Sequence, residues 1–209
     1  MFTEERKQIA AFMRRLYRQG LTTTSGGNIS WRVSDEYVLL TPSKIDKGEL
    51  QGTDIGVLTT DGENLTPELP PSIETEMHLS IYRTRPDARA VVHAHPLAAT
   101  ALSATRREIN CRYIAESYAL VGTPVRAPYA MMGTPDLAAS VSQAAREGNC
   151  IILDNHGVLA IGITLLEAFD RLEVLERAAQ TMLLLHAQGE ARELTAEQLT
   201  ELDVLMQRQ

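Results

Sequence analysis

Residues 91–96 read VVHAHP and place two histidines two positions apart at the end of an apolar run. Side chains alternate between the two faces of a β-strand, so His93 and His95 should leave the same face together. Pro96 should end the strand just beyond them. Histidine is the commonest metal ligand among the side chains, so the pair indicates a metal site. An exposed strand with alternating polar residues would give the same letters.

A third histidine follows another apolar run, in CIILDNHGVLAIG. This pattern predicts two strands joined by a tight turn, with His156 at the bend and Gly157 supplying a backbone conformation that other residues resist. Alone, His156 would be interpreted as a hydrogen-bonded turn residue. Together with His93 and His95 it completes a three-histidine set of the kind found in catalytic zinc sites, where a further position stays open.

The best candidate for an acidic partner is Glu74, in PPSIETEMH. Pro70 and Pro71 lead into Ser72, which we expect to be the N-cap of a helix with Glu74 in its first turn. The helix dipole alone would also explain a glutamate there. His78 lies four residues further along the same helix face, where we expect a supporting or core role rather than metal binding.

Two short turn sequences are suited to binding an anion such as phosphate. In SGGNIS, Gly27 allows close approach of the backbone and Asn28 offers a donor, while in TPSK, Ser43 offers a hydroxyl and Lys44 a charge. Ser72, at the expected helix N-terminus, is a third element of this kind. The chain contains neither G-x-G-x-x-G nor G-K-[ST], so dinucleotide and P-loop sites are not indicated.

Other charged groups are interpreted as structural. His186 lies near the end of a long helical pattern and should complement the C-terminus of that helix. Glu173, Glu176 and Arg177, in the same helix, look like a solvated charged face.

Both helices and strands are needed to position these residues. Apolar spacing predicts helices over residues 3–19, around 73–85, over 97–104, from about 134 to 146, from about 165 onward and near 195–207. Strands are predicted within NISWRV, YVLL, DIGVL, VVHAH, PVRAPYA and the two arms of CIILDNHGVLAIG. The stretch between about 105 and 124 is expected to be a loop, and Thr164 and Glu167 an N-terminal capping box. The mixture, without an internal repeat, predicts one α/β domain.

The 209-residue chain is 44% hydrophobic, enough for a substantial core without disulfides, and its two cysteines form no C-x-x-C pair. A reducing cytoplasm is therefore the expected location. The N-terminus does not resemble a secretory signal, and no apolar run approaches the roughly 20 residues of a membrane span, so no membrane partner is expected. The net charge of −7 argues against broad nucleic-acid binding but not against a small anionic ligand.

Six motifs, read in order, resemble the class II aldolase/adducin family: SGGNIS, TPSKIDKGEL, PPSIETEMH, AVVHAHP, APYAMMGT and NHGVLAIG. They cover roughly residues 5–188 and are most similar to those of zinc-dependent sugar-phosphate aldolases of the L-fuculose-1-phosphate type. The resemblance implies a single domain over residues 1–209, with a three-layer α/β/α fold around a mostly antiparallel sheet. It also implies a homotetramer.

The resemblance implies roles for individual residues as well. The family's zinc ligands correspond to His93, His95 and His156. Glu74 matches an acid that ligates the resting metal and then serves as a base. The phosphate-binding positions correspond to Gly27, Asn28, Ser43 and Ser72.

Two positions depart from the family pattern. Ile73 stands where fuculose-type aldolases have a second serine, and Lys44 stands where they have a glycine. These changes suit either a rearranged phosphate pocket or a substrate whose anion is a carboxylate. The family's tyrosine acid, which a neighbouring subunit contributes, corresponds to Tyr113 if a one-residue gap is allowed, with Tyr118 as the alternative.

The resulting prediction is a zinc-dependent aldolase that cleaves a ketose 1-phosphate to dihydroxyacetone phosphate and a short aldehyde through a metal-stabilised enediolate. Mn²⁺ or Co²⁺ would also suit the ligand set. The alternatives on the same metal platform are a dehydratase of the methylthioribulose-1-phosphate type, an epimerase, or a decarboxylase of a sugar-acid phosphate. Family members with the adducin role lack the metal ligands, so a non-catalytic scaffold is the less favoured reading of this chain.

Overall fold

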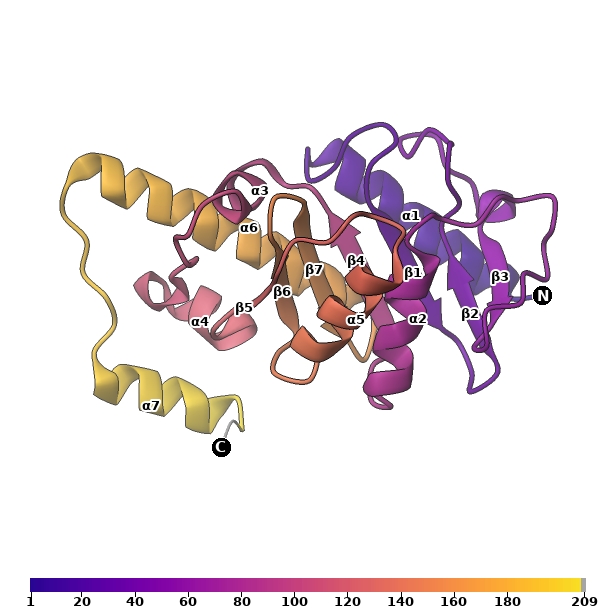
Figure 1. The fold of residues 1–209 in the computed structure, drawn as a ribbon. Coiled ribbons are helices and arrows are strands. Elements are labelled where there is room, and N and C mark those ends of the chain that lie inside the picture. The colour runs from indigo at the N-terminus through magenta and orange to yellow at the C-terminus, as the bar shows by residue number, and fades with distance from the viewer. Residues whose placement is uncertain (208–209) are drawn as a thin grey trace.

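Seven strands form one sheet in the order β3-β2-β1-β4-β7-β6-β5 in the computed structural model, which describes residues 1–207 (Figure 1). The strands are β1 (Asn28–Arg32), β2 (Tyr37–Leu40), β3 (Gly56–Thr59), β4 (Ala90–Ala94), β5 (Val125–Ala127), β6 (Cys150–Leu153) and β7 (Gly157–Gly162). Neighbouring strands are antiparallel except for β5 and β6. The mostly antiparallel sheet is confirmed. The last two residues of the predicted domain, 208–209, lie outside the described range.

Helices cover both faces of this sheet, which gives the predicted three layers (Figure 1). On one face lie α1 (Thr3–Arg18), α3 (Leu97–Ser103) and α6 (Leu165–Gln188), and on the other lie α2 (Thr75–Thr84) and α5 (Pro135–Ala144). Strand β4 illustrates the alternation, because Val92 packs into the first core and Val91 into the second. A strand covered on both faces reads as a continuous apolar run, as VV does here.

The stretch between about 105 and 124 is not the loop that the sequence suggested. It contains a short 3₁₀ turn, η2 (Cys111–Tyr113), and a helix, α4 (Ala115–Val121), which packs on α6 and on α7 (Ala196–Leu205). The Tyr118 hydroxyl donates to Asp203 Oδ2 at 2.9 Å and ties α4 to α7. With seven residues, α4 is too short for its apolar spacing to stand out from the sequence.

The N-terminus of α6 has only one half of the predicted capping box. Thr164 Oγ1 accepts the backbone N–H of Glu167 as a capping residue should, but the Glu167 carboxylate accepts the N–H of Ile163 rather than that of Thr164.

Within residues 1–207, no helix is both long enough and apolar enough to cross a membrane.

Glu176 was expected on a solvated face, and that expectation is wrong. The residue is buried, and its carboxylate accepts the backbone N–H groups of Ala98 and Ala99 as well as the side chain of Gln180. The N–H groups at the start of a helix lack intrahelical partners and favour negative charge, which explains how a glutamate is tolerated there. Glu176 therefore fastens the start of α3, just after the His93–His95 pair, to α6.

Candidate metal and substrate site

The three predicted metal-binding histidines meet at one end of the sheet. His93 is fully buried near the end of β4, His95 follows that strand directly, and His156 lies in the turn between β6 and β7. Because β4 and β7 are paired, the two segments lie side by side. One ligand nitrogen of each histidine lies within 4.8 Å of the others, and the Nε2 atoms of His93 and His95 are 3.1 Å apart.

His93 and His95 are in the neutral form that binds metal. His93 Nδ1 donates to the Val158 carbonyl at 3.0 Å, which leaves the Nε2 lone pair directed at the cluster. Burial lowers the pKa of His93, and burial together with the neighbouring His93 and His156 lowers the pKa of His95 to about 3. A histidine must be neutral to ligate a metal, so the site needs little proton release near pH 7.

Glycines make room for His95. A Cβ atom on Gly26 would lie 2.8 Å from His95 Nδ1, and one on Gly157 would lie 2.6 Å from His95 Cδ2. The expectation that Gly157 supplies an unusual backbone conformation is wrong, because the residue with positive φ in this turn is Asn155 (φ 54°). Gly157 is needed for space rather than for conformational freedom.

Glu74 reaches the histidine cluster from the start of α2. Its carboxylate oxygens lie 3.5 Å from His93 Nε2 and 3.2 Å from His156 Nε2. Ser72 is not the N-cap of this helix. Glu74 itself is the N-cap, and the Ser72 hydroxyl accepts the Glu74 backbone N–H in the preceding turn. The carboxylate therefore sits one residue ahead of the predicted first turn and points at the sheet rather than along the helix.

One oxygen of Glu74 is held and the other is not. Asn28 Nδ2 donates to Oε2 at 2.7 Å, whereas Oε1 is buried and accepts no hydrogen bond from any residue in the described range. Burial by itself raises the pKa of this carboxyl, but His93, His156 and Asn28 outweigh burial and bring the pKa below its usual value. The group is an anion with one oxygen near His93 Nε2 and the other near His156 Nε2.

This donor set fits a divalent metal. Two nitrogens bound tetrahedrally to zinc are expected about 3.4 Å apart, given Zn–N bonds of about 2.0–2.1 Å, and the His93 and His95 nitrogens are 3.1 Å apart. Buried polar atoms are nearly always satisfied; Glu74 Oε1 has no aligned hydrogen bond within the described residues and lies 3.2 Å from His156 Nε2, so a metal ion held by the histidines would also be within reach of this carboxylate.

The predicted anion-binding residues lie around this cluster. Asn28 Nδ2 also approaches Ser72 Oγ, at 3.2 Å, and the backbone N–H of Ser43 donates to the Pro70 carbonyl at 3.1 Å. These contacts join the three predicted loops. Gly27 has φ 66°, and a Cβ there would lie 2.7 Å from the His93 carbonyl. Lys44 is exposed, with φ 57°.

Lys47 was not singled out from the sequence. It is buried, its Nζ donates to the Pro42 carbonyl at 2.5 Å, and its backbone N–H donates to the Thr24 carbonyl at 2.9 Å. It thereby connects the two loops that carry Gly27 and Ser43. Burial lowers its pKa to about 8. A lysine beside Asp46 and Gly48 reads as a surface residue, so no sequence signal would have found it.

His78 lies in the core, which is one of the two placements expected for it. It is fully buried on α2, its Nε2 faces Asn28 Oδ1, and its Nδ1 lies 2.7 Å from Ser30 Oγ. Burial, together with the neighbouring His93, lowers its pKa to about 3.

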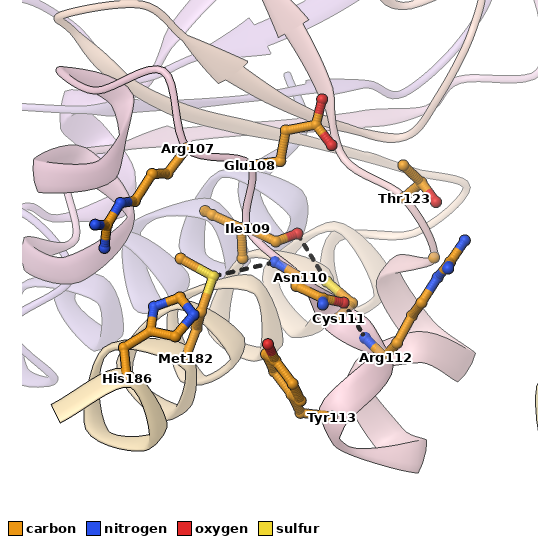
Figure 2. Close-up of a pocket in the computed structure, with 11 residues that line it drawn as sticks. Arg107, Glu108, Ile109, Asn110, Cys111, Arg112, Tyr113, Thr123, Met182 and His186 are labelled. Carbon is orange, nitrogen blue, oxygen red and sulfur yellow. Dashed lines mark hydrogen bonds between the residues drawn. The ribbon is translucent and has the colours of Figure 1, made fainter. Parts of the chain in front are cut away.

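Tyr113 lies elsewhere. It lines a cavity of about 850 Å³ (Figure 2) whose lining residues, within the described part of the chain, include none of the four metal-site residues. Figure 2 shows its ring pointing from η2 into the cavity, across from Met182 and His186 of α6. One chain alone therefore does not bring Tyr113 to the histidines. His186 is exposed in the last turn of α6, as predicted, and also borders this cavity.

Comparison with known proteins places this chain in a family. Residues 7–183 match the family model described as "Class II Aldolase and Adducin N-terminal domain". The chain belongs to this family. A 5-deoxy-D-ribulose 1-phosphate aldolase of Bacillus thuringiensis is 31% identical over 204 residues, covering 97% of this chain and 95% of the relative.

Two further relatives show the range of chemistry in the family. A 3-oxo-tetronate 4-phosphate decarboxylase of Haemophilus influenzae is 34% identical over 195 residues, covering 91% of each chain. A solved structure of L-fuculose 1-phosphate aldolase is 31% identical and superposes with a TM-score of 0.89, over 98% of this chain and 97% of the other. Relatives of this kind are enzymes that act on sugar phosphates, and they include both aldolases and a decarboxylase.

Proposed function

We propose that the protein is a class II aldolase that cleaves a ketose 1-phosphate to dihydroxyacetone phosphate and a short aldehyde. The observation that carries this proposal is the placement of Glu74. Its carboxylate lies 3.2–3.5 Å from two of the three clustered histidines, with one oxygen held by Asn28 and the other unused. A base beside a metal-binding cluster is the arrangement that carbon–carbon cleavage next to a carbonyl requires.

His93, His95 and His156, with Glu74 as a fourth ligand before substrate arrives, would hold Zn²⁺, with Mn²⁺ or Co²⁺ as alternatives. A metal ion there would supply Lewis acidity at the substrate carbonyl and stabilise the charge that develops as the bond breaks. Glu74 then exchanges a proton with carbon 3 of the ketose fragment through Oε1. Asn28 keeps Oε2 in place during that transfer.

The substrate phosphate would lie among the three loops that meet beside the cluster. Gly27 lets the backbone approach closely, and Asn28, Ser43 and Ser72 supply donors. Lys44 is exposed and adds positive charge at the rim of this group. The catalytic assignments of these residues rest on the family resemblance and on their common location.

Tyr113 is proposed to exchange a proton with the aldehyde oxygen. Since it lies in a different part of its own chain, it would act in the site of a neighbouring copy, in a homotetramer. The proposal further holds that the enzyme works in the cytoplasm on a small sugar phosphate, without nucleic-acid or membrane partners.

A decarboxylase of a sugar-acid phosphate is the second candidate. The Haemophilus influenzae relative, 34% identical over 91% of this chain, is a 3-oxo-tetronate 4-phosphate decarboxylase, and this supports the candidate. Loss of carbon dioxide would use the same charge-stabilising cluster on a different bond.

One assay separates the two. Metal-analysed protein is incubated with L-fuculose 1-phosphate, D-ribulose 1-phosphate, 5-deoxy-D-ribulose 1-phosphate and 3-oxo-tetronate 4-phosphate, with and without chelator. Chelator-sensitive release of dihydroxyacetone phosphate and an aldehyde from a ketose 1-phosphate, without carbon dioxide, is the expected result. Loss of carbon dioxide from 3-oxo-tetronate 4-phosphate also leaves dihydroxyacetone phosphate, so carbon dioxide is the product that separates the two. Release of carbon dioxide from that substrate, with no cleavage of the ketose phosphates, would replace the aldolase by the decarboxylase.

A further inference from the structure

A line of buried polar side chains runs from Glu74 away from the histidine cluster, between β1 and α2. All of its members are at most 4% exposed: Asn28, Ser30, His78 and Tyr82. Asn28 and Ser30 lie on the same face of β1, and His78 and Tyr82 lie one turn apart on α2. Every adjacent pair is in hydrogen-bond contact. The proposed chemistry uses Glu74 and Asn28 but assigns nothing to the three residues behind them.

The direction of each hydrogen bond in this line follows from its chemistry. An ionised carboxylate only accepts, so the amide nitrogen of Asn28 must face Glu74 Oε2, which leaves its oxygen toward His78. His78 Nε2 must then carry the hydrogen that Asn28 Oδ1 accepts. A neutral imidazole has one hydrogen, so Nδ1 accepts from Ser30 Oγ at 2.7 Å.

The last hydrogen bond of the line joins Ser30 and Tyr82. The hydroxyl hydrogen of Ser30 is committed to His78, so Ser30 Oγ accepts from the Tyr82 hydroxyl at 2.7 Å. The chain of donors therefore runs from Tyr82 through Ser30 and His78 to Asn28, and ends on Glu74. The Tyr82 hydroxyl also lies 3.4 Å from the Arg89 carbonyl, a longer contact than the 2.7 Å to Ser30 Oγ. Such a line specifies a single orientation of the Asn28 amide.

We infer that His78 is a positioning residue, which acts through the Asn28 amide to fix Glu74 with Oε2 held and Oε1 directed at the histidine cluster. Ser30 and Tyr82 support it by keeping the hydrogen of His78 on Nε2. This inference rests on the proposed function of Glu74 as the base. Without His78, Asn28 Oδ1 would be buried with no donor, and the amide would turn toward another partner and release Glu74.

A purely structural role would also place a polar residue here, so the test needs variants that differ in one donor. In His78→Gln the side-chain amide nitrogen falls near the position of Nε2 and can donate to Asn28. In His78→Asn the amide falls near Nδ1 and cannot reach it, and His78→Phe removes both groups. Thermal melting selects the variants that fold. Comparing the glutamine and asparagine variants keeps the test valid even if the phenylalanine variant does not fold.

Kinetics of the metal-loaded enzyme are the first readout. We expect kcat to fall about 10- to 100-fold in His78→Asn and His78→Phe, with KM within about twofold of wild type and partial recovery of kcat in His78→Gln. Tyr82→Phe, at the far end of the line, should change kcat by less than about threefold. Equal losses in the glutamine and asparagine variants, or a change in KM alone, would overturn the assignment.

The second readout does not depend on any substrate. Long-range ¹H–¹⁵N spectra of wild-type protein should show His78 as the neutral tautomer with hydrogen on Nε2. The Asn28 side-chain amide signals should move in His78→Asn but stay near their wild-type positions in His78→Gln. A hydrogen on Nδ1 instead would overturn the inference whatever the enzyme does. If these spectra are as expected but no ketose phosphate is cleaved, the positioning role is supported and the aldolase proposal fails.

Discussion

The histidine–glutamate cluster and the Tyr113 cavity differ in how much of a site each provides within one chain. The cluster is closed: His93 is fully buried, Glu74 is 6% exposed, and hydrogen bonds to Val158 and Asn28 fix their orientation. The cavity is open: Tyr113 is half-buried, and Arg107, Arg112 and His186 around it are exposed (Figure 2).

This difference divides the proposed chemistry into two halves. The half that binds metal and moves a proton at carbon is preorganised by the fold of a single chain. Tyr113, the proposed acid of the other half, lines an open cavity whose lining residues, among those that the structure describes, include none of the four metal-site residues. An isolated chain should therefore bind metal fully but catalyse poorly.

The largest effect is expected from Glu74→Gln. Removing the base should lower kcat by about 10²- to 10⁴-fold, because general base catalysis contributes that much, while metal analysis should still find the ion on the three histidines. Glu76→Gln is the matched control, since Glu76 is exposed on the same helix and pairs with Arg83. A Glu74→Gln enzyme with wild-type turnover would mean that the closed cluster does not contain the base.

Tyr113→Phe tests the open half. We expect kcat to fall about 10²-fold or more through the loss of an acid, and metal content to stay unchanged. Tyr118→Phe is the comparison, because Tyr118 is the alternative acid and its hydroxyl contacts Asp203 of α7; we expect a smaller loss there, and a larger one would assign the acid to Tyr118. The division between two copies is tested by dissociating Glu74→Gln and Tyr113→Phe proteins and reassembling them together.

In a ring of copies, random assembly of two inactive variants would restore about one quarter of the sites, since each site needs an intact residue from each of two neighbours. Recovery near that level, measured as specific activity, would support the division. A mixture that stays inactive would place both residues in the site of one chain.

A smaller effect is expected from Lys47, on stability rather than turnover. Its pKa falls from 10.5 to about 8 on burial, so between these values the unfolded chain binds more protons than the folded one. The free energy of unfolding should thus rise with pH from about 8 to 10.5, by up to about 3 kcal/mol. Below pH 8 the full cost of the buried charge remains.

The measurement is urea unfolding at several pH values for wild type, Lys47→Met and the exposed control Lys44→Met. The difference between wild type and Lys47→Met should grow in favour of wild type as pH rises, whereas Lys44→Met should follow wild type. Parallel curves for all three proteins would show that burial does not lower the pKa of Lys47.

The smallest effect is expected from Lys44→Gly. An exposed lysine contributes at most about 1 kcal/mol to the binding of an anion, and less as salt screens the charge. Affinity for inorganic phosphate, compared at low and high salt, should fall about fivefold or less at low salt only. Because Lys44 has φ 57°, glycine should also raise the melting temperature slightly. Unchanged phosphate affinity would make Lys44 a surface lysine.

The site was largely predictable where local rules determine geometry. Alternation along β4 brings His93 and His95 together, and a strand–turn–strand pattern brings His156 beside them. These arguments need only the period of a strand and the pairing of neighbours. The same reasoning correctly gave α1, α5, α6 and the sheet strands, apart from their exact ends.

Prediction failed where the partner lies far away in the sequence. Glu176 looked solvated because its partners, the N–H groups of Ala98 and Ala99, belong to another helix. Lys47 is buried by loops that no periodicity describes. The sequence did not reveal that the Asn28 amide contacts Ser72 and Glu74, which lie more than 40 residues away. Tertiary contacts of this kind override local preference, and one sequence does not reveal them.

The order of strands in the sheet has a consequence for how the protein is made. β4, with His93, lies between β1 and β7, so the cluster draws on segments from Asn28 to His156. Synthesis proceeds from the N-terminus, and β7, which ends at Gly162, is among the last parts of the sheet to emerge. Before it does, a nascent chain offers a metal ion only two of the three histidines. A metal ion would therefore bind after the sheet has formed rather than nucleate folding. Cells short of metal should then accumulate a folded protein without metal instead of an unfolded one.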